Sequence, residues 1–135
     1  MIGTDVAQPA PDVQPVLFVE DNDDLRDVFI ELTEFTLHRQ CVGARSYDEL
    51  VALGSRALDC DIAIVDINLG PNRPSGLDAY RWLRGHGHRG RIVFLTGHAA
   101  THPLVVEAQR IGDAEVVAKP IEPERLRSII EGTRR

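Results

Sequence analysis

The sequence has few of the features that mark secreted or membrane proteins. It contains only two cysteines, Cys41 and Cys60, and no apolar segment behind a basic start that would serve as a secretion signal. No apolar run approaches the roughly 20 residues needed to cross a bilayer. We therefore expect a reduced, cytoplasmic protein that does not interact with membranes and has no disulfide.

Basic residues are also in short supply. Lysine and arginine together number 15 against 21 acidic residues, which gives a net charge of -6. Binding to nucleic acid depends on basic side chains that neutralise phosphates, and here they are scattered apart from Arg134 and Arg135 at the end of the chain. We expect no direct binding to nucleic acid.

The length of 135 residues suits one domain with its own core. The first 15 residues include Pro9, Pro11 and Pro15 among small and polar residues, a composition that supplies neither a helix nor a core. The sequence therefore predicts a flexible leader over residues 1–15 and a single domain over residues 16–135.

Short, nearly continuous apolar runs predict strands that are buried on both faces of a sheet. We expect strands at Val16–Val19, Asp61–Asp66, Arg91–Thr96 and Glu115–Lys119, and a weaker one around Cys41 and Val42. A helix is predicted after each strand from apolar residues at helical spacing. The alternation of five strands with five helices is typical of a parallel sheet with helices on both faces. We predict the flavodoxin-like, doubly wound α/β fold with strand order 2-1-3-4-5.

Local signals place the starts of these helices. In the first helix, Leu25, Val28, Phe29, Leu32 and Phe35 share helical spacing, and Asp23 is expected to cap the first turn. Ser46 and Glu49 are predicted to form a capping box for the second helix. The third is expected from Leu77 to about Arg84, the fourth from Thr101 or His102 with Pro103 in its first turn, and the fifth near Pro123.

Polar residues stand at the downstream ends of four predicted strands. Glu20 and Asp21 follow the first, Asp66 ends the third, and Thr96 and Lys119 end the last two. The carboxyl ends of parallel strands lie at one edge of the sheet, where ligands bind. The sequence therefore predicts one pocket that contains acids, a hydroxyl and an amine.

Such a pocket suits phosphoryl transfer. A carboxylate can attack phosphorus and form an acyl phosphate, but clustered acids repel each other and the incoming phosphate. Mg²⁺ would cancel this charge, with Asp21 and Asp66 as ligands and Glu20 holding a coordinated water. Lys119 and the Thr96 hydroxyl could bind phosphoryl oxygens.

These residues resemble those of response-regulator receiver domains of bacterial two-component signalling, of the chemotaxis-regulator type, over residues 16–131. The resemblance implies that Asp66 is the phosphoacceptor, Thr96 the switch hydroxyl and Lys119 the phosphate-binding lysine. It also implies that the backbone carbonyl of Asn68 is a metal ligand and that Lys119 precedes Pro120 through a cis peptide bond.

The same resemblance implies a function in a Mg²⁺-dependent phosphorelay rather than an enzyme of metabolism. A sensor histidine kinase or a phosphotransfer protein would donate the phosphoryl group to Asp66, and the signal would pass to a downstream protein partner. A phosphorylation-dependent homodimer remains open. The few residues after the last helix, near Glu131, leave no room in this chain for a DNA-binding module.

The sequence departs from the family pattern in three places. Gly70 stands where a proline is usual, four residues after Asp66, and Gly76 lies ten residues after Asp66 instead of about eight. Val116 replaces the tyrosine or phenylalanine that usually stands three residues before the lysine. We expect a longer loop beside the pocket and a switch that works without the usual aromatic side chain.

Two other functions are compatible with parts of this pattern. The first is a Mg²⁺-dependent phosphohydrolase with an aspartyl-phosphate intermediate, although Asn68 stands where such enzymes carry a second catalytic aspartate. The second is a receiver-like docking module that acts without phosphorylation. The five histidines are scattered and predict no metal site of their own, and His98 is expected as a solvent-facing loop residue.

Overall fold

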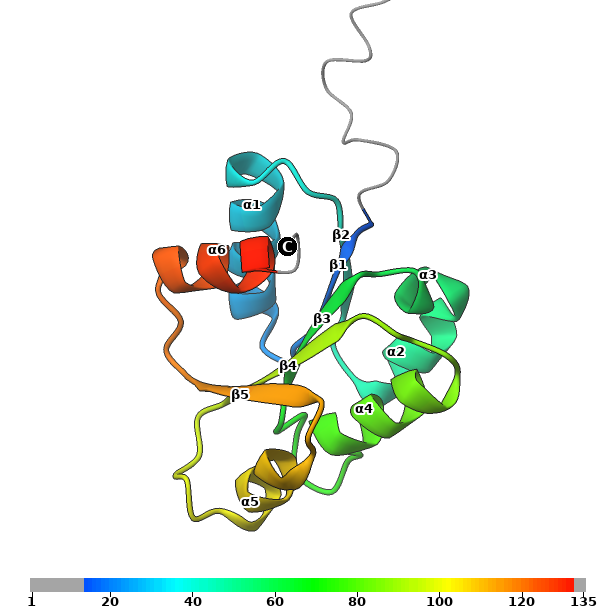
Figure 1. The fold of residues 1–135 in the computed structure, drawn as a ribbon, viewed down its shortest axis with the longest axis vertical. Helices are drawn as coiled ribbons and strands as arrows, with labels where there is room; N and C mark the ends of the chain where they lie inside the picture. Colours follow the sequence, from blue (N-terminus) through cyan, green and yellow to red (C-terminus); the bar gives the residue numbers. More distant parts are fainter. Residues whose placement is uncertain (1–13, 133–135) are drawn as a thin grey trace, which may run out of the picture.

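The computed structural model describes residues 14–132, which form a three-layer arrangement of helices around one sheet (Figure 1). Residues 1–13 of the expected leader and residues 133–135 lie outside this range. In chain order the elements are β1 (Val16–Val19), α1 (Asp23–Thr36), β2 (Cys41–Ala44), α2 (Tyr47–Leu53), α3 (Ser55–Leu58), β3 (Ile62–Asp66), α4 (Gly76–Gly85), β4 (Arg91–Thr96), α5 (Pro103–Arg110), β5 (Ala114–Ala118) and α6 (Pro123–Glu131).

The sheet confirms the predicted topology. All strand pairs are parallel, and the order is β2-β1-β3-β4-β5. Val19 pairs in register with Val65, and Asp66 pairs with Leu95. The ends of β1, β3 and β4 therefore lie side by side at one edge of the sheet.

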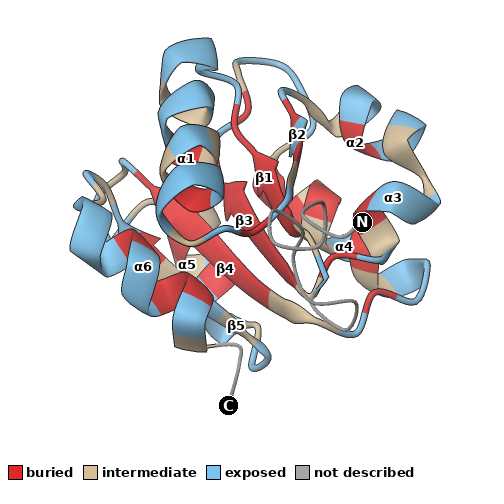
Figure 2. Ribbon diagram, turned by 90° about the horizontal axis from the view of Figure 1, so that it is seen from above, coloured by how far each residue is buried: buried red, intermediate tan, exposed pale blue. Residues whose placement is uncertain are grey.

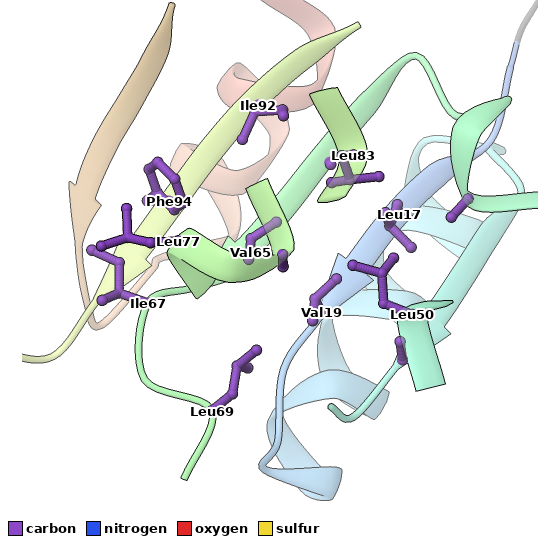
Figure 3. Packing of buried hydrophobic residues seen from close by; sticks show 14 of the residues in the cluster. Leu17, Val19, Leu50, Val65, Ile67, Leu69, Leu77, Leu83, Ile92 and Phe94 are labelled. Carbon is purple, nitrogen blue, oxygen red and sulfur yellow. The ribbon is translucent and has the colours of Figure 1, made fainter. Parts of the chain in front are cut away.

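Two hydrophobic layers enclose the sheet and explain the continuous apolar runs. Helices α1 and α6 cover one face, and α2 to α5 cover the other (Figure 1). Figure 2 shows the strands as the most buried part of the molecule. In Figure 3, Leu17, Val65 and Phe94 of the sheet lie in one apolar layer with Leu50 of α2 and Leu83 of α4. Because alternate residues of each strand enter opposite layers, neither face can be polar.

The helix starts differ in detail from the sequence predictions. Asn22, not Asp23, caps α1, and its side-chain oxygen accepts from the backbone N–H of Leu25 at 2.9 Å. Ser46 accepts from Glu49 N–H as predicted, but the Glu49 carboxylate accepts from the N–H of Arg45 and not of Ser46. The backbone conformation at each helix start therefore decides which N–H group the side-chain oxygen accepts from.

Three further corrections concern the elements that cover the sheet. The described residues contain six helices rather than five, because Gly54 adopts a positive φ of 57° and separates the one-turn α3 from α2. Helix α4 begins at Gly76 with a capping box of Ser75 and Asp78 that the sequence reading missed. Strand β5 lies one residue earlier than predicted, at Ala114–Ala118.

Helix α1 buries a narrower face than its apolar spacing suggests. Phe29 is buried against the sheet, whereas Val28 and Phe35 are 48 % and 76 % exposed. The inward face is defined by Phe29 and Thr33, so Val28 and Phe35 fall on the outer side of the helix. No helix within residues 14–132 has the length and apolarity required to span a membrane.

Candidate functional site

Three acidic side chains meet at the edge of the sheet where β1 and β3 end. Carboxylate oxygens of Glu20, Asp21 and Asp66 all lie within 4.8 Å of one another. Glu20 and Asp66 are only 3 % and 5 % exposed, whereas Asp21 is exposed. The acids belong to an open pocket of about 430 Å³ that is lined by Glu20, Asp21, Asn22, Leu25, Asp66, Asn68, Gly97, His98 and Lys119.

Lys119 brings a positive charge between the two buried acids. Its ammonium nitrogen lies 2.9 Å from Asp66 Oδ2 and 3.0 Å from Glu20 Oε1. The Lys119–Pro120 peptide bond is cis, as the resemblance implied. The backbone N–H of Lys119 donates to the carbonyl of Thr96 at 2.7 Å, which fixes the start of this segment against β4.

The second oxygen of Asp66 is held by the backbone that follows it. Asp66 Oδ1 accepts from the N–H of Asn68 at 3.1 Å, and Asn68 Oδ1 accepts in turn from the N–H of Gly70 at 3.0 Å. The Asn68 side chain is thus engaged in the turn. Asn68 lines the pocket, and its backbone carbonyl remains the candidate metal ligand that the resemblance implies.

The electrostatics of the pocket reflect an excess of negative charge. Burial and, after it, the charge of the neighbouring Asp66 raise the pKa of Glu20 to about 7, against the opposing effect of Lys119. Burial alone would lower the pKa of Lys119, but its contacts with Asp66 and Glu20 outweigh burial and raise that pKa above the ordinary value. The site therefore stabilises a charged lysine and disfavours ionisation of Glu20.

The donor set fits a divalent cation. Three carboxylates lie together, and Lys119 contacts only two of them, Glu20 and Asp66. Glu20 Oε1 is buried without a hydrogen-bond donor among residues 14–132, although Lys119 lies within ion-pair distance of it. Carboxylate and carbonyl oxygens are the ligands preferred by Mg²⁺, which needs only one or two carboxylates and keeps several waters. A hard cation here would supply the missing positive charge.

Thr96 lies beside this group but does not line the pocket. It is 4 % exposed and directly follows Leu95, the register partner of Asp66. Its hydroxyl oxygen accepts from the backbone N–H of His98 at 2.9 Å. The hydroxyl is therefore held by the β4–α5 loop.

His98 is not the solvent-facing loop residue that the sequence predicted. It is half-buried, lines the pocket, and stacks its ring on that of His102 with a centroid distance of 4.0 Å and an interplanar angle of 10°. The two histidines precede a helix in an irregular segment. No periodicity was available to place them together; the four-residue spacing was the only signal.

The longer loop beside the pocket returns the chain to the end of β3. A Cβ atom on Gly76 would lie 2.3 Å from the carbonyl oxygen of Asp66, so only glycine fits this approach. The N–H of Gly76 donates to the carbonyl of Ile67 at 2.8 Å. Helix α4 thus starts directly against the phosphoacceptor candidate despite the two additional loop residues.

Val116 occupies the position at which the resemblance leads to the expectation of an aromatic side chain. Val116 is half-buried in β5, where it pairs in register with Phe94 and packs at the margin of the core on the α2–α5 face. The ring that packs near Phe94 comes instead from Tyr80 of α4, with a centroid distance of 5.8 Å.

A parallel five-stranded sheet of this order, with acids and a lysine at its carboxyl edge, defines a phosphoacceptor signalling domain of flavodoxin-like fold. The sequence matches the response regulator receiver domain family over residues 16–131. The chain belongs to this family of two-component signalling domains.

Known relatives agree with this assignment. The chain is 28 % identical to the two-component response regulator PprB of Pseudomonas aeruginosa over 120 residues, which cover 88 % of this chain and 43 % of that protein. It is 26 % identical to the transcriptional regulatory protein FixJ of Azorhizobium caulinodans, with coverage of 83 % and 51 %. The crystal structure of the receiver domain of NtrX from Brucella abortus aligns with a TM-score of 0.73 and 25 % identity, covering 87 % of this chain and 96 % of that one.

The chain spans about half the length of the curated relatives that it matches. What it shares with them is the receiver domain, whose general properties are Mg²⁺ binding and interaction with a histidine kinase or phosphotransfer partner.

Proposed function

We propose that Asp66 accepts a phosphoryl group from a phosphohistidine of a sensor kinase or phosphotransfer protein. The observation that carries this proposal is the way Asp66 is held: Lys119 binds one carboxylate oxygen and the Asn68 N–H binds the other, at the floor of an open pocket. Both contacts orient the nucleophile without enclosing it, so a phosphorus atom can approach from the solvent side.

The transfer needs little from the protein besides position and charge. An oxygen of Asp66 forms the new bond to phosphorus, the bond from phosphorus to the donor imidazole nitrogen breaks, and that nitrogen keeps the electron pair. The ammonium group of Lys119 already lies 2.9 Å from Asp66 Oδ2, so it can donate to a phosphoryl oxygen once the new bond has formed. Bound Mg²⁺ would neutralise the charge that develops on the phosphoryl oxygens.

The metal ligands follow from the positions of the donors. Asp21 is exposed at the mouth of the pocket and Asp66 lies at its floor, so both can bind the ion directly. Glu20 is buried behind them and would act through a coordinated water, which would also give its unsatisfied Oε1 a donor. The backbone carbonyl of Asn68 completes the set of protein ligands.

The outer side of α1 is a suitable docking surface for the phosphoryl donor. Asn22 and Leu25 at the start of α1 line the pocket, and Val28 and Phe35 continue as exposed apolar side chains along the same helix. Acidic residues flank them at positions 24, 27, 31 and 34. A partner helix that combines apolar and basic side chains would complement this surface.

Other functions receive less support from the geometry. A phosphohydrolase would need a second acid at position 68, but Asn68 stands there and its side-chain oxygen is bonded to Gly70. A docking module without phosphorylation has no use for three neighbouring acids, two of which are paired with one lysine. We therefore infer a cytoplasmic signalling domain that is not an enzyme beyond its own phosphorylation and dephosphorylation, and that signals to a protein partner or through a homodimer.

Intact-mass measurement after incubation with a small phosphodonor tests the proposal. We expect one hydroxylamine-labile phosphoryl group per chain that requires Mg²⁺ and disappears in Asp66→Asn. Asp59→Asn is the matched control, because it removes an exposed carboxylate outside the pocket and should label normally. Equal labelling of Asp66→Asn and Asp59→Asn would refute the assignment of Asp66.

A further inference from the structure

The loop between β4 and α5 contains a contact that the receiver chemistry does not explain. From Gly97 to His102, only the two histidines are half-buried, and Gly97, Ala99, Ala100 and Thr101 are exposed. The histidine rings lie 4.0 Å apart and are nearly parallel. The stacked pair thus links the two ends of this loop.

The residue that carries the first ring is hydrogen-bonded to the Thr96 hydroxyl through its backbone. The N–H of His98 donates to Thr96 Oγ1 at 2.9 Å. If the Thr96 hydroxyl turned toward a phosphoryl oxygen on Asp66, its hydrogen bond with the His98 amide would change. The His98 amide would then either follow the hydroxyl oxygen and carry its ring along, or lose this bond and leave that end of the stack less restrained.

The second ring is attached to a helix. His102 is the N-cap of α5, and its Nδ1 accepts from the N–H of Leu104 at 3.1 Å. The ring that stacks on His98 is therefore the same ring that satisfies a free donor of the first turn of α5. A displacement of His98 changes the support of this cap, and with it the stability of the start of α5.

On the side of α5 that faces β5, no described side chain can transmit the state of Thr96 in the same way. Val116 of β5 has a short side chain with one preferred rotamer, so it cannot swing between an inward and an outward position. Helix α5 is held elsewhere by Val105 and Ala108 against the sheet and by an ion pair between Glu107 and Arg81 of α4. These contacts are remote from Thr96 in the chain and contain no group that phosphorylation would address.

We propose that the stacked rings of His98 and His102 form the coupling element that transmits the state of Thr96 to the first turn of α5, in place of the aromatic side chain missing at position 116. The proposal rests on phosphorylation at Asp66. Both histidines are positioning residues: His98 acts through the Thr96 hydroxyl and His102 through the helix cap. Phosphorylation can shift the conformation of α5 only if the stack is made differently with and without the phosphoryl group.

Three variants separate the ring contact from the backbone and cap contacts. His98→Ala removes the ring and keeps the N–H to Thr96, and His102→Asn removes the ring and keeps a good N-cap acceptor. His98→Phe keeps a flat ring that can stack on His102 and serves as the conservative rescue. Amide hydrogen exchange is measured over residues 103–110 and 114–118 with and without a small phosphodonor and Mg²⁺, and is normalised to the phosphorylated fraction found by intact mass.

In the wild type we expect phosphorylation to change exchange in residues 103–110, with little change in residues 114–118. His98→Ala and His102→Asn should lose most of this response per phosphorylated chain, and His98→Phe should restore it. A wild-type response in both ring-deleted variants, or its loss in His98→Phe, would overturn the coupling role. Failure of Asp66 to become labelled at all would be visible in the mass spectrum and would overturn the proposed function first.

Discussion

The ammonium group of Lys119 lies 2.9 Å from Asp66 Oδ2 and thereby joins the residue that follows β5 to the end of β3 across the candidate site. It also lies 3.0 Å from Glu20 Oε1, so one cation serves two buried carboxylates. The lysine therefore supplies part of the positive charge that the buried carboxylates and an incoming phosphoryl group require, and a bound metal ion would supply the rest.

Lys119→Met should therefore slow phosphorylation strongly. The variant keeps most of the side-chain volume but removes the donor to Asp66, and the loss of one preorganised charge at a transferring group typically lowers a rate roughly 100- to 1000-fold. Lys119→Arg, which keeps the charge with a different shape, should retain part of the rate. The measurement is the initial rate of labelling by a small phosphodonor at saturating Mg²⁺, and equal rates for all three proteins would exclude a role for the lysine.

Glu20 should make the metal-free protein less stable as the pH rises. Its folded-state pKa of about 7 lies above the ordinary value of 4.5, so the folded protein binds more protons than the unfolded chain between these two values. Its contribution to stability is therefore fully present below about pH 4.5 and is lost as the pH rises through 7.

Urea denaturation with a chelator present checks this dependence. Glu20→Gln should gain stability relative to the wild type as the pH increases from 5 to 8, by on the order of 1 kcal/mol or more. Asp59→Asn removes the same charge outside the pocket and should show no such gain. If Glu20→Gln instead lost stability on the alkaline side, the carboxylate would be stabilised by its surroundings, contrary to our description.

Mg²⁺ binding should depend more on Asp21 than on Glu20. Asp21 is exposed at the pocket mouth and can bind the ion directly, whereas the buried Glu20 acts through water. We expect Asp21→Ala to weaken the affinity for Mg²⁺ measured by calorimetry much more than Glu20→Ala does. Equal losses in the two titrations would show that both carboxylates are direct ligands.

The sequence predicts most of this fold because its strands are distinct. Val16–Val19 and Arg91–Thr96 are apolar runs that end at polar residues, and both have the predicted bounds. The rule that parallel strand ends share one edge also brought Glu20, Asp66 and Lys119 together correctly.

What escaped prediction depends on tertiary or backbone detail. The choice of Asn22 over Asp23 as a cap depends on the φ and ψ of adjacent acidic and amide residues that are equally suitable by type. The exposure of Phe35 follows from the face that α1 turns toward the sheet, which apolar spacing alone does not fix. The contact between His98 and His102 lies in an irregular loop, where no period exists to be read.

Gly76→Ala should damage both the fold and the site. Its Cβ would lie 2.3 Å from the Asp66 carbonyl oxygen and 2.9 Å from Ile67 Cα, and both obstacles are backbone atoms. We expect a loss of more than about 2 kcal/mol in the free energy of unfolding. Gly85→Ala, at the other end of α4, meets no atom within 4 Å and is the matched control. Comparable urea midpoints for the two variants would mean that the start of α4 can move away from β3.

His88 should make the fold sensitive to acid. Its side chain is buried, its Nε2 lies 2.9 Å from the carbonyl oxygen of Cys60, and its Nδ1 lies 3.3 Å from the guanidinium of Arg84. Only a protonated nitrogen can donate to a carbonyl, and only an unprotonated one can accept from arginine. The contacts therefore select the neutral ring with its proton on Nε2.

Burial lowers the pKa of His88 below its ordinary value of 6.5, and the neighbouring Arg84 contributes in the same direction. The unfolded chain then binds more protons than the folded one at pH values just below 6.5, so stability must fall as the pH decreases through this range, by at most about 1.4 kcal/mol per pH unit for one proton. His88→Gln can keep a donor toward Cys60 but cannot take up a proton. Urea denaturation should give a wild-type protein that loses stability relative to His88→Gln between pH 7 and pH 5. Because Glu20 acts in the opposite direction over part of this range, the difference between the two proteins, and not the wild-type curve alone, decides the result. A difference that stays constant with pH would show that folding does not lower the pKa of His88.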